Sequence, residues 1–279
     1  MTVIVTRPHT PFVTGGPEAL FRVGQVTNDG GLIRGSMRTG DWMLGRDGQP
    51  CRGALGVLAD DILGYALIAE RPHGRFAVST EISVDFCSPF PVDGSTLYAE
   101  GYPVEFDMIG GLSRGRIVDR IGRTIAFGSE RVRYVPETPS APGYVSSADV
   151  FAGRNGLVDS NRRSTPDPLR ATTRRHDNGA TLELAAAPEL SNPLGTMHGG
   201  ISLCASEMAG LAALQSGPHP LVTASVHIAY LRPVSVAGEV TFTATVLHRG
   251  RTMGIAQVVS HNSAGKACTI ATVTCHDPS

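Results

Sequence analysis

The sequence predicts an α+β protein made of two copies of one unit, each a long helix wrapped by a curved antiparallel sheet. Two observations support this prediction. The chain repeats itself with a period near 146 residues, and each copy places an amphipathic helix before a series of alternating strands. The apolar stripe of such a helix is buried when it packs on the concave face of a sheet.

The repeat is recognised by residues that keep their order and spacing. Gly53 corresponds to Gly199 and Asp61 to Glu207, both at an offset of 146 residues. Later matches have slightly smaller offsets, and they pair Pro89 with Pro233, Gly94 with Gly238 and Gly122 with Gly265. Small insertions and deletions in loops produce such a drift, whereas chance matches do not keep order and register.

The long helix of each copy is predicted from apolar residues at i, i+3 and i+4 spacing. The first helix is expected over residues 53–70. The matching apolar positions are Leu55, Leu58, Ile62, Tyr65 and Ala66 in the first copy, and Ile201, Cys204, Met208, Leu211 and Ala212 in the second.

Strands of alternating pattern follow each helix. The first of them centre on Val78 to Phe86 and Val222 to Tyr230. Further strands are expected at 96–106, 114–121 and 124–135, then at 239–248, 253–261 and 266–275, with one strand before each helix at about 20–37 and 178–188.

The predicted organisation is an N-terminal tail (1–18), a divergent first domain (19–135), a linker (136–175) and a second domain (176–279). The linker is rich in Pro, Ser and Arg, and a short helix is expected near Ser147 to Gly153.

The composition is typical of a globular protein. Hydrophobic residues make up 41% of the 279 residues and the net charge is −1, so nothing favours nucleic acid or an anionic membrane. The N-terminus has no apolar stretch typical of a signal peptide or a membrane span. The five cysteines contain no CxxC pair, which argues against a zinc site and a disulfide framework. We expect a cytoplasmic protein without a metal or other cofactor.

The second copy resembles a known family. The segments SNPLGTMHGGISLCASEMAG and LVTASVHIAYLRPVSVAGEV look like the phenylacetate-pathway type of acyl-CoA thioesterase, within the 4-hydroxybenzoyl-CoA thioesterase superfamily. The resemblance covers about residues 180–276, and residues 20–135 look like a more divergent member. Together the halves resemble a double-hotdog thioesterase, in which one chain imitates the family's homodimer.

The resemblance implies a site shared between two halves. One half gives an Asn, a His and the first amide of the HGG turn, and the other gives a carboxylate from its central helix and a hydroxyl from the next strand. Carried onto this chain, the site joins Asn192, His198 and Gly199 to Asp61 and Ser79.

Asp61 is chosen over Asp60 because the repeat aligns Asp60 with Ser206. The reverse combination forms a second site in which the Asn and the His are both replaced. It joins Arg46, Arg52 and Gly53 to Glu207 and Thr223. We therefore expect one competent site and one degenerate site per chain.

Each residue type suits thioester hydrolysis. The Gly199 N–H, at a helix N-terminus, is a donor for the developing oxyanion. Asp61 is expected to act as nucleophile or general base, with Ser79 holding a water molecule. Asn192 is expected to orient the carboxylate or the carbonyl. Substrate contacts are expected from Gly200, Thr80, Arg249 and Arg251, the two arginines meeting CoA phosphates.

Structural alternatives stand beside these roles. Asp61 also suits a turn cap or an arginine pair, and His198 and Asn192 each suit a turn. Alternation puts Ser79 and Thr80 on opposite strand faces, so only one of them points at the site. The basic run His248 to Arg251 also fits an exposed hairpin.

The predicted function is hydrolysis of an acyl-CoA thioester to acid and thiol. The first rival is a non-catalytic acyl-CoA binder or regulator. The second is a hotdog hydratase or dehydratase, whose Asp-x-Asn-Pro-x-His signature is broken by Leu190 and Gly195. The acyl group is not readable from the sequence, and a homo-oligomer of the two-copy chain is left open.

Overall fold

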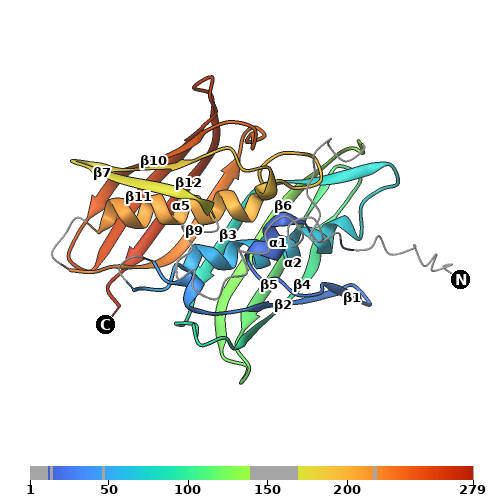
Figure 1. The fold of residues 1–279 in the computed structure, drawn as a ribbon. Coiled ribbons are helices and arrows are strands. Elements are labelled where there is room, and N and C mark those ends of the chain that lie inside the picture. The colour runs from blue at the N-terminus through green and yellow to red at the C-terminus, as the bar shows by residue number, and fades with distance from the viewer. Residues whose placement is uncertain (1–11, 13–14, 46–47, 139–168, 216–218, 279) are drawn as a thin grey trace, which may run out of the picture.

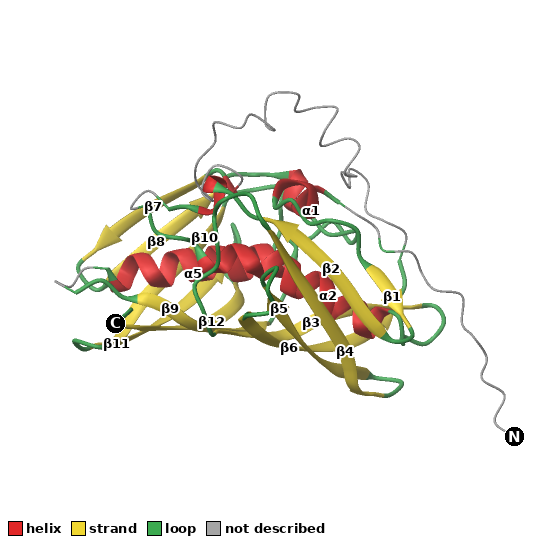
Figure 2. Ribbon diagram, turned by 90° about the horizontal axis from the view of Figure 1, so that it is seen from below, coloured by secondary structure: helices red, strands yellow, loops and turns green. Residues whose placement is uncertain are grey.

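The computed structural model describes residues 12, 15–45, 48–138, 169–215 and 219–278. Within these residues, the chain forms one continuous antiparallel sheet with two long helices on its concave side (Figures 1 and 2). Strands at the two ends of the sheet fold over the helices, so that each helix is enclosed (Figure 2). This confirms the predicted α+β architecture.

The first half holds the following elements in chain order: α1 (Gly16–Leu20), β1 (Thr27–Asp29), β2 (Leu32–Arg38), the helical turns η1 (Asp41–Met43) and η2 (Arg52–Leu55), α2 (Gly56–Ile68), β3 (Arg75–Phe86), β4 (Thr96–Phe106), β5 (Gly110–Val118) and β6 (Thr124–Pro136). The second half holds β7 (Ala171–His176), β8 (Gly179–Leu184), η3 (Pro188–Leu190), α5 (Gly199–Leu214), β9 (Val222–Tyr230), β10 (Val240–Arg249), β11 (Met253–His261) and β12 (Ala267–His276).

The 12 described strands follow the order β1-β2-β4-β5-β6-β3-β9-β12-β11-β10-β8-β7. Strands β3 and β9 meet in the middle as an antiparallel pair, with Ser83 opposite His227. The order of strands away from this seam is nearly the same in both directions. The two halves are therefore joined by backbone hydrogen bonds, and the internal repeat appears as a pseudo-two-fold arrangement.

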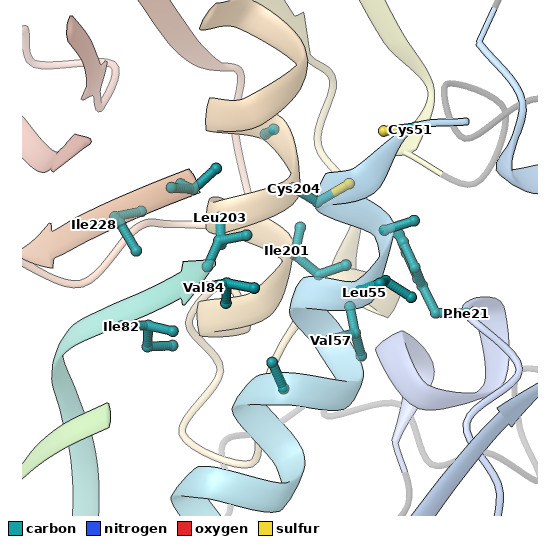
Figure 3. Close-up of a cluster of buried hydrophobic side chains, with 14 of the residues drawn as sticks. Phe21, Cys51, Leu55, Val57, Ile82, Val84, Ile201, Leu203, Cys204 and Ile228 are labelled. Atoms are coloured by element: carbon teal, nitrogen blue, oxygen red, sulfur yellow. The ribbon is translucent and has the colours of Figure 1, made fainter. Parts of the chain in front are cut away.

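One part of the core lies where α2 and α5 meet the seam. Figure 3 shows Leu55 and Val57 on the α2 side packing beside Ile201 and Leu203 of α5. Ile228 of β9 and Ile82 and Val84 of β3 close the cluster on the side of the sheet. These side chains are fully buried. Apolar burial of this kind stabilises the fold and fixes the N-terminus of α5 against α2.

A β-bulge decides which hydroxyl of β3 faces the helices. Ser79 pairs with Val132 of β6 and Glu81 pairs with Arg131, so Thr80 is the extra residue between them. Strict alternation from the buried Ile82 would turn the Thr80 side chain toward the helices. The bulge shifts this alternation by one residue, so that the Ser79 side chain faces the helices instead.

Several predicted boundaries are wrong. Helix α1 crosses the end of the tail predicted for 1–18, because its buried Glu18 packs into the site described below. The strands expected at 20–37 and 178–188 are present as β2 and β8, and each also pairs with one strand that was not predicted separately, β1 or β7. Strand β7 begins inside the predicted linker and ends one residue beyond it, since an exposed edge strand carries no alternating apolar pattern. The helix expected near Ser147 to Gly153 lies outside the described residues.

Candidate active site

A cleft with a volume of about 650 Å³ lies between the two halves. Volumes of this order are typical of small-molecule sites. Its polar lining comes from both halves and includes Glu18, Asp60, Asp61, Ser79, Thr80, Glu130, Asn192, Thr196, His198, Gly199, Ser202 and Tyr230. Its apolar lining includes Phe12, Tyr65, Ile68, Phe76, Val132 and Leu231. The cleft thus combines an ionisable end with an apolar region.

His198 joins the second half to the acids of the first half. Its Nδ1 lies 2.9 Å from Asp60 Oδ2, and its Nε2 lies 3.1 Å from Asp61 Oδ1. The side chain is buried. Burial alone lowers the pKa of His198, but the Asp60 and Asp61 carboxylates outweigh burial and hold that pKa well above its usual value. Each ring nitrogen of His198 thus lies within hydrogen-bonding distance of one acid, and Nδ1 also lies 3.1 Å from the Gly200 N.

Asp60 receives more hydrogen bonds than any other acid described in the cleft. The Gly200 N–H, at the start of α5, donates to Asp60 Oδ2 over 2.7 Å, and His198 Nδ1 lies 2.9 Å from the same oxygen. The Ser79 hydroxyl lies 3.3 Å from Asp60 Oδ1. Donors at a helix N-terminus stabilise a carboxylate in its ionised form. Oδ1 is the more weakly held oxygen and is the one available to a water molecule.

The contacts between the helices change the alignment of the two copies by one residue. A Cβ built at Gly53 would lie 3.0 Å from the Cα of Cys204, and a Cβ built at Gly200 would lie 2.5 Å from the Cα of Val57. These are equivalent contacts in the two halves, and both pairs correspond at an offset of 147. The second copy has two consecutive glycines, Gly199 and Gly200, and from the sequence alone Gly53 can be matched to either of them.

In the corrected alignment, Asp60 rather than Asp61 corresponds to Glu207, and Cys51 corresponds to His198. The contacts agree with this assignment, because Cys51 Sγ lies 3.4 Å from Glu207 Oε2, as His198 lies beside Asp60. The alignment of Asp60 with Ser206 is therefore wrong. The spacing of nine residues between the turn and the acid is the same in both halves.

Asp61 lies next to the imidazole, away from the α5 amide. Its Oδ1 accepts from His198 Nε2, while its buried Oδ2 has no partner among the described residues. Burial and the nearby Glu18 raise the pKa of Asp61 to about 7, against the opposing effect of His198. Asp61 is therefore only partly ionised at neutral pH.

Two acids of the cleft were not predicted from the sequence. Glu18 of α1 places Oε1 3.7 Å from His198 Nε2 and accepts the Gly15 N–H through Oε2. Glu130 of β6 places Oε1 2.7 Å from the Ser79 hydroxyl. Both side chains are buried. An acid on the inward face of a predicted strand was the available signal for Glu130.

Gly199 presents its backbone to the cleft. Its N–H donates to no acceptor within the described part of the chain, and its carbonyl accepts the Tyr230 hydroxyl over 2.7 Å. A Cβ at Gly199 would lie 2.8 Å from Asp60 Oδ2, so only glycine brings this amide so close to the acid. An open N–H at the first turn of a helix suits a developing oxyanion.

Asn192 organises the turn before α5. Its Oδ1 accepts the Leu194 N–H, the Thr196 N–H and the Thr196 hydroxyl over 3.0, 3.2 and 3.2 Å. The side chain also lines the cleft. Its Nδ2 group is the part that remains for a ligand, so the structure supports the turn role and leaves the substrate role a prediction.

The second predicted site is a buried cluster in which Glu207 is completely enclosed. Glu207 accepts the Thr223 hydroxyl and the Cys51 thiol. Burial raises its pKa, and these two bonds partly offset that effect. Gly53 packs against Glu207.

Arg52 takes the place that Gly199 has in the first site. It donates to the Thr223 carbonyl over 2.9 Å and lies over the Phe86 ring. Arg46, the other replacement predicted there, lies outside the described residues.

Some of the predicted substrate contacts lie at the cleft and others lie away from it. Thr80 lines the cleft, although its hydroxyl donates to the Arg131 carbonyl, and the Gly200 N–H is used by Asp60. Arg249 does not line this cleft. It bonds the Leu214 carbonyl at the C-terminal end of α5, and Arg251 is exposed in the adjacent turn. The arginines are wrongly placed for this site because the hairpin that carries them extends from the opposite end of the helix.

One group of residues has the spacing of metal ligands. Donor atoms of Glu18, Asp61 and His198 lie within 4.8 Å of one another, and all three residues are buried. Two carboxylates and an imidazole suit a divalent transition metal. The His198 nitrogen of this group is already hydrogen-bonded to Asp61. The expectation of a metal-free protein stays a prediction.

Comparisons with known proteins agree with the double-hotdog arrangement. Residues 194–269 match the model of the Thioesterase superfamily. Acyl-coenzyme A thioesterase 13 of Mus musculus is 29% identical over 87 residues, which are 30% of this chain and 62% of that protein. The chain thus spans less than two thirds of the curated relative. No described helix has the length and apolar character needed to cross a membrane.

Solved structures extend the likeness to nearly the whole chain. The tesB protein of Mycobacterium avium subs paratuberculosis has a TM-score of 0.60 at 10% identity, covering 91% of this chain and 96% of its own. Acyl-CoA thioesterase II TesB2 of Mycobacterium marinum has a TM-score of 0.61 at 9% identity, covering 93% and 96%. The 12:0-ACP thioesterase of Umbellularia californica has a TM-score of 0.59 at 11% identity, covering 88% and 94%. The family resemblance is confirmed for residues 194–269, and the fold of the chain is a double hotdog.

Proposed function

We propose that the protein hydrolyses an acyl-CoA thioester at one site, formed by the start of α5 and the acids of α2. One observation carries the proposal. The acceptor-free Gly199 N–H opens onto a cleft in which Asp60, from the other half, lies against the same glycine. An oxyanion donor and a carboxylate at one reacting centre are the two groups that thioester hydrolysis needs.

In the proposed reaction the thioester carbonyl oxygen accepts the Gly199 N–H. A water molecule at Asp60 Oδ1 attacks the carbonyl carbon and gives its proton to Asp60. The tetrahedral intermediate then collapses, the carbon–sulfur bond breaks, and Asp60 returns the proton to the leaving sulfur. The products are a carboxylic acid and a thiol. His198 keeps Asp60 in place by its Nδ1–H.

The lining of the cleft supports this substrate class. Apolar side chains such as Phe76 and Val132 suit an acyl group, and Arg133 and Arg232 of the same cleft suit the phosphates of CoA. These two arginines replace Arg249 and Arg251 as the proposed phosphate contacts.

The test is thiol release from acyl-CoAs of several chain lengths and from an aryl-CoA. The wild type is expected to release thiol above the buffer blank, and Asp60→Asn is expected to lower kcat by about 100-fold or more, the loss typical of a general base. Asp85→Asn is the matched control, because Asp85 is exposed on β3. Binding of all substrates without cleavage of any would instead establish a non-catalytic acyl-CoA protein.

A hydratase is the second candidate, because an imidazole of one half is bonded to carboxyl groups of the other half in the same cleft. Such a pair moves protons in addition of water to a double bond. Chromatography of an enoyl-CoA reaction separates the two activities. Hydrated product without free thiol would replace the hydrolase proposal.

A further inference from the structure

Glu130 forms the far end of a hydrogen-bonded chain that reaches Asp60. The Ser79 hydroxyl oxygen lies 2.7 Å from Glu130 Oε1 and 3.3 Å from Asp60 Oδ1. Ser79 has one hydrogen, so it cannot donate to two ionised carboxylates at once. One of the two acids therefore carries a proton whenever both contacts are hydrogen bonds.

The surroundings decide which acid is neutral. Asp60 receives the Gly200 N–H and the Nδ1–H of His198 in addition to Ser79. Glu130 is 1% exposed, and its Oε2 has no partner among the described residues. Donors stabilise the charge on Asp60, whereas burial without donors disfavours a charge on Glu130. Burial and the nearby Asp60 indeed raise the pKa of Glu130 well above its usual value.

Among the described residues, this series of hydrogen bonds from Glu130 through Ser79 to Asp60 is present in only one half of the molecule. Ser79 pairs with Val132 across β3 and β6, and Thr223 pairs with Cys275 across β9 and β12. Glu130 on β6 therefore corresponds to Val273 on β12, which is completely buried. The acid thus accompanies the cleft that has the open glycine amide, and a valine stands at the degenerate site.

We propose that Glu130 is a positioning residue, which keeps its own proton and holds the Asp60 carboxylate oriented through Ser79. This inference rests on the proposed hydrolase function. Glu130 donates to Ser79, and Ser79 donates to Asp60 Oδ1. Glu130 exchanges no proton with the substrate in this arrangement.

The test compares pH profiles of kcat/KM for three variants. Glu130→Gln keeps a donor to Ser79 and is expected to retain most activity at neutral pH. Glu130→Val copies the other half and is expected to lower kcat by about tenfold or more, as the hydrogen bond that supports a charged group is lost. Glu105→Gln, at an exposed position of β4, is the control.

The alkaline side of the profile is the decisive readout. The groups that face Glu130 are Asp60 and Asp61 of α2, Ser79 of β3, His198 before α5 and Tyr230 of β9. Wild-type activity is expected to fall when Glu130 loses its proton, and Glu130→Gln is expected to lack this fall. An unchanged alkaline fall in Glu130→Gln, or a neutral-pH loss as large as in Glu130→Val, would overturn the proposal.

Infrared difference spectroscopy tests the inference without a substrate. Besides any band from Asp61, the wild type is expected to show at neutral pH a protonated-carboxyl band that disappears in Glu130→Gln. Its absence from the wild type would overturn the inference even if thiol release is observed. If the band is present and no thiol is released, the hydrolase proposal fails while the neutral Glu130 stands.

Discussion

At the scale of single residues, the two adjacent acids of α2 have different environments. Asp60 faces the start of α5 and receives a backbone N–H, whereas Asp61 faces only the imidazole edge of His198 and the nearby Glu18. The sequence contains both acids but not the contact that distinguishes them. Neighbouring residues of a helix point in directions that differ by about 100°. Gly53 can be matched to Gly199 or to Gly200, so the repeat alone does not show which of the two acids points toward α5.

Stability is expected to depend on pH through Asp61. Its pKa is raised from 3.8 to about 7 in the folded protein, so the folded state binds more protons than the unfolded state between these values. The stability linked to this group is therefore complete below pH 3.8 and is lost as the pH rises through 7. Asp61→Asn lacks this titrating group and does not lose that stability. The melting temperature of Asp61→Asn minus that of the wild type is therefore expected to increase as the pH rises from 4 to about 8.

The measurement is thermal unfolding of both proteins across this range. A difference in melting temperature that does not change with pH would contradict the raised pKa. In the thiol-release assay, Asp61→Asn is expected to lose less activity than Asp60→Asn, because Asp61 acts through His198. Equal losses would show that the two acids work as one unit.

At the scale of secondary-structure elements, the long helices and most strands could be predicted from periodicity. The predicted 253–261 strand agrees with β11, and the neighbouring strands differ by only a few residues. The bulge on β3 could not be predicted, because it depends on pairing with β6 and not on the strand's own pattern. The same limit applies to Glu18, whose approach to His198 depends on how α1 packs.

The close approach of α5 to Asp60 gives a prediction about Gly199. Gly199→Ala is expected to fold normally, because the described atoms nearest to the added Cβ belong to the flexible Asp60 carboxylate. The carboxylate has to move away, and kcat is expected to fall by about tenfold or more, as a displaced reacting group would cause.

Steady-state kinetics and melting temperature check this prediction. Gly238→Ala is the matched control, since a Cβ there would contact nothing within 4 Å. Wild-type kcat in Gly199→Ala would argue against Asp60 as the base beside this amide.

At the scale of the whole molecule, the described residues form one open cleft, which holds the proposed site, and one enclosed cluster, which is depleted of the Gly and the His. Arg52 and Cys51 occupy the positions of Gly199 and His198 in the depleted cluster, where Glu207 is enclosed by hydrogen bonds. The crosswise combination of the halves was predictable from the repeat and the family resemblance. Cytoplasmic location and further oligomerisation stay predictions.

The asymmetry predicts one ligand per chain. Glu207→Gln is expected to change kcat/KM by no more than about twofold, the coupling typical of separate sites. Calorimetric titration with a CoA product is expected to give one binding site per chain. Two equivalent sites, or a loss in Glu207→Gln as large as in Asp60→Asn, would contradict the one-site arrangement.

The hydrogen-bonded seam between β3 and β9 also bears on how such a molecule diverges. In a homodimer, every substitution is present in both subunits, so a change that harms one reaction centre harms both. Here the two copies are covalently one chain, and each is free to mutate alone. Drift in one cleft leaves the other intact, and a depleted cluster of this kind is a place where a new ligand specificity can arise without loss of the original chemistry.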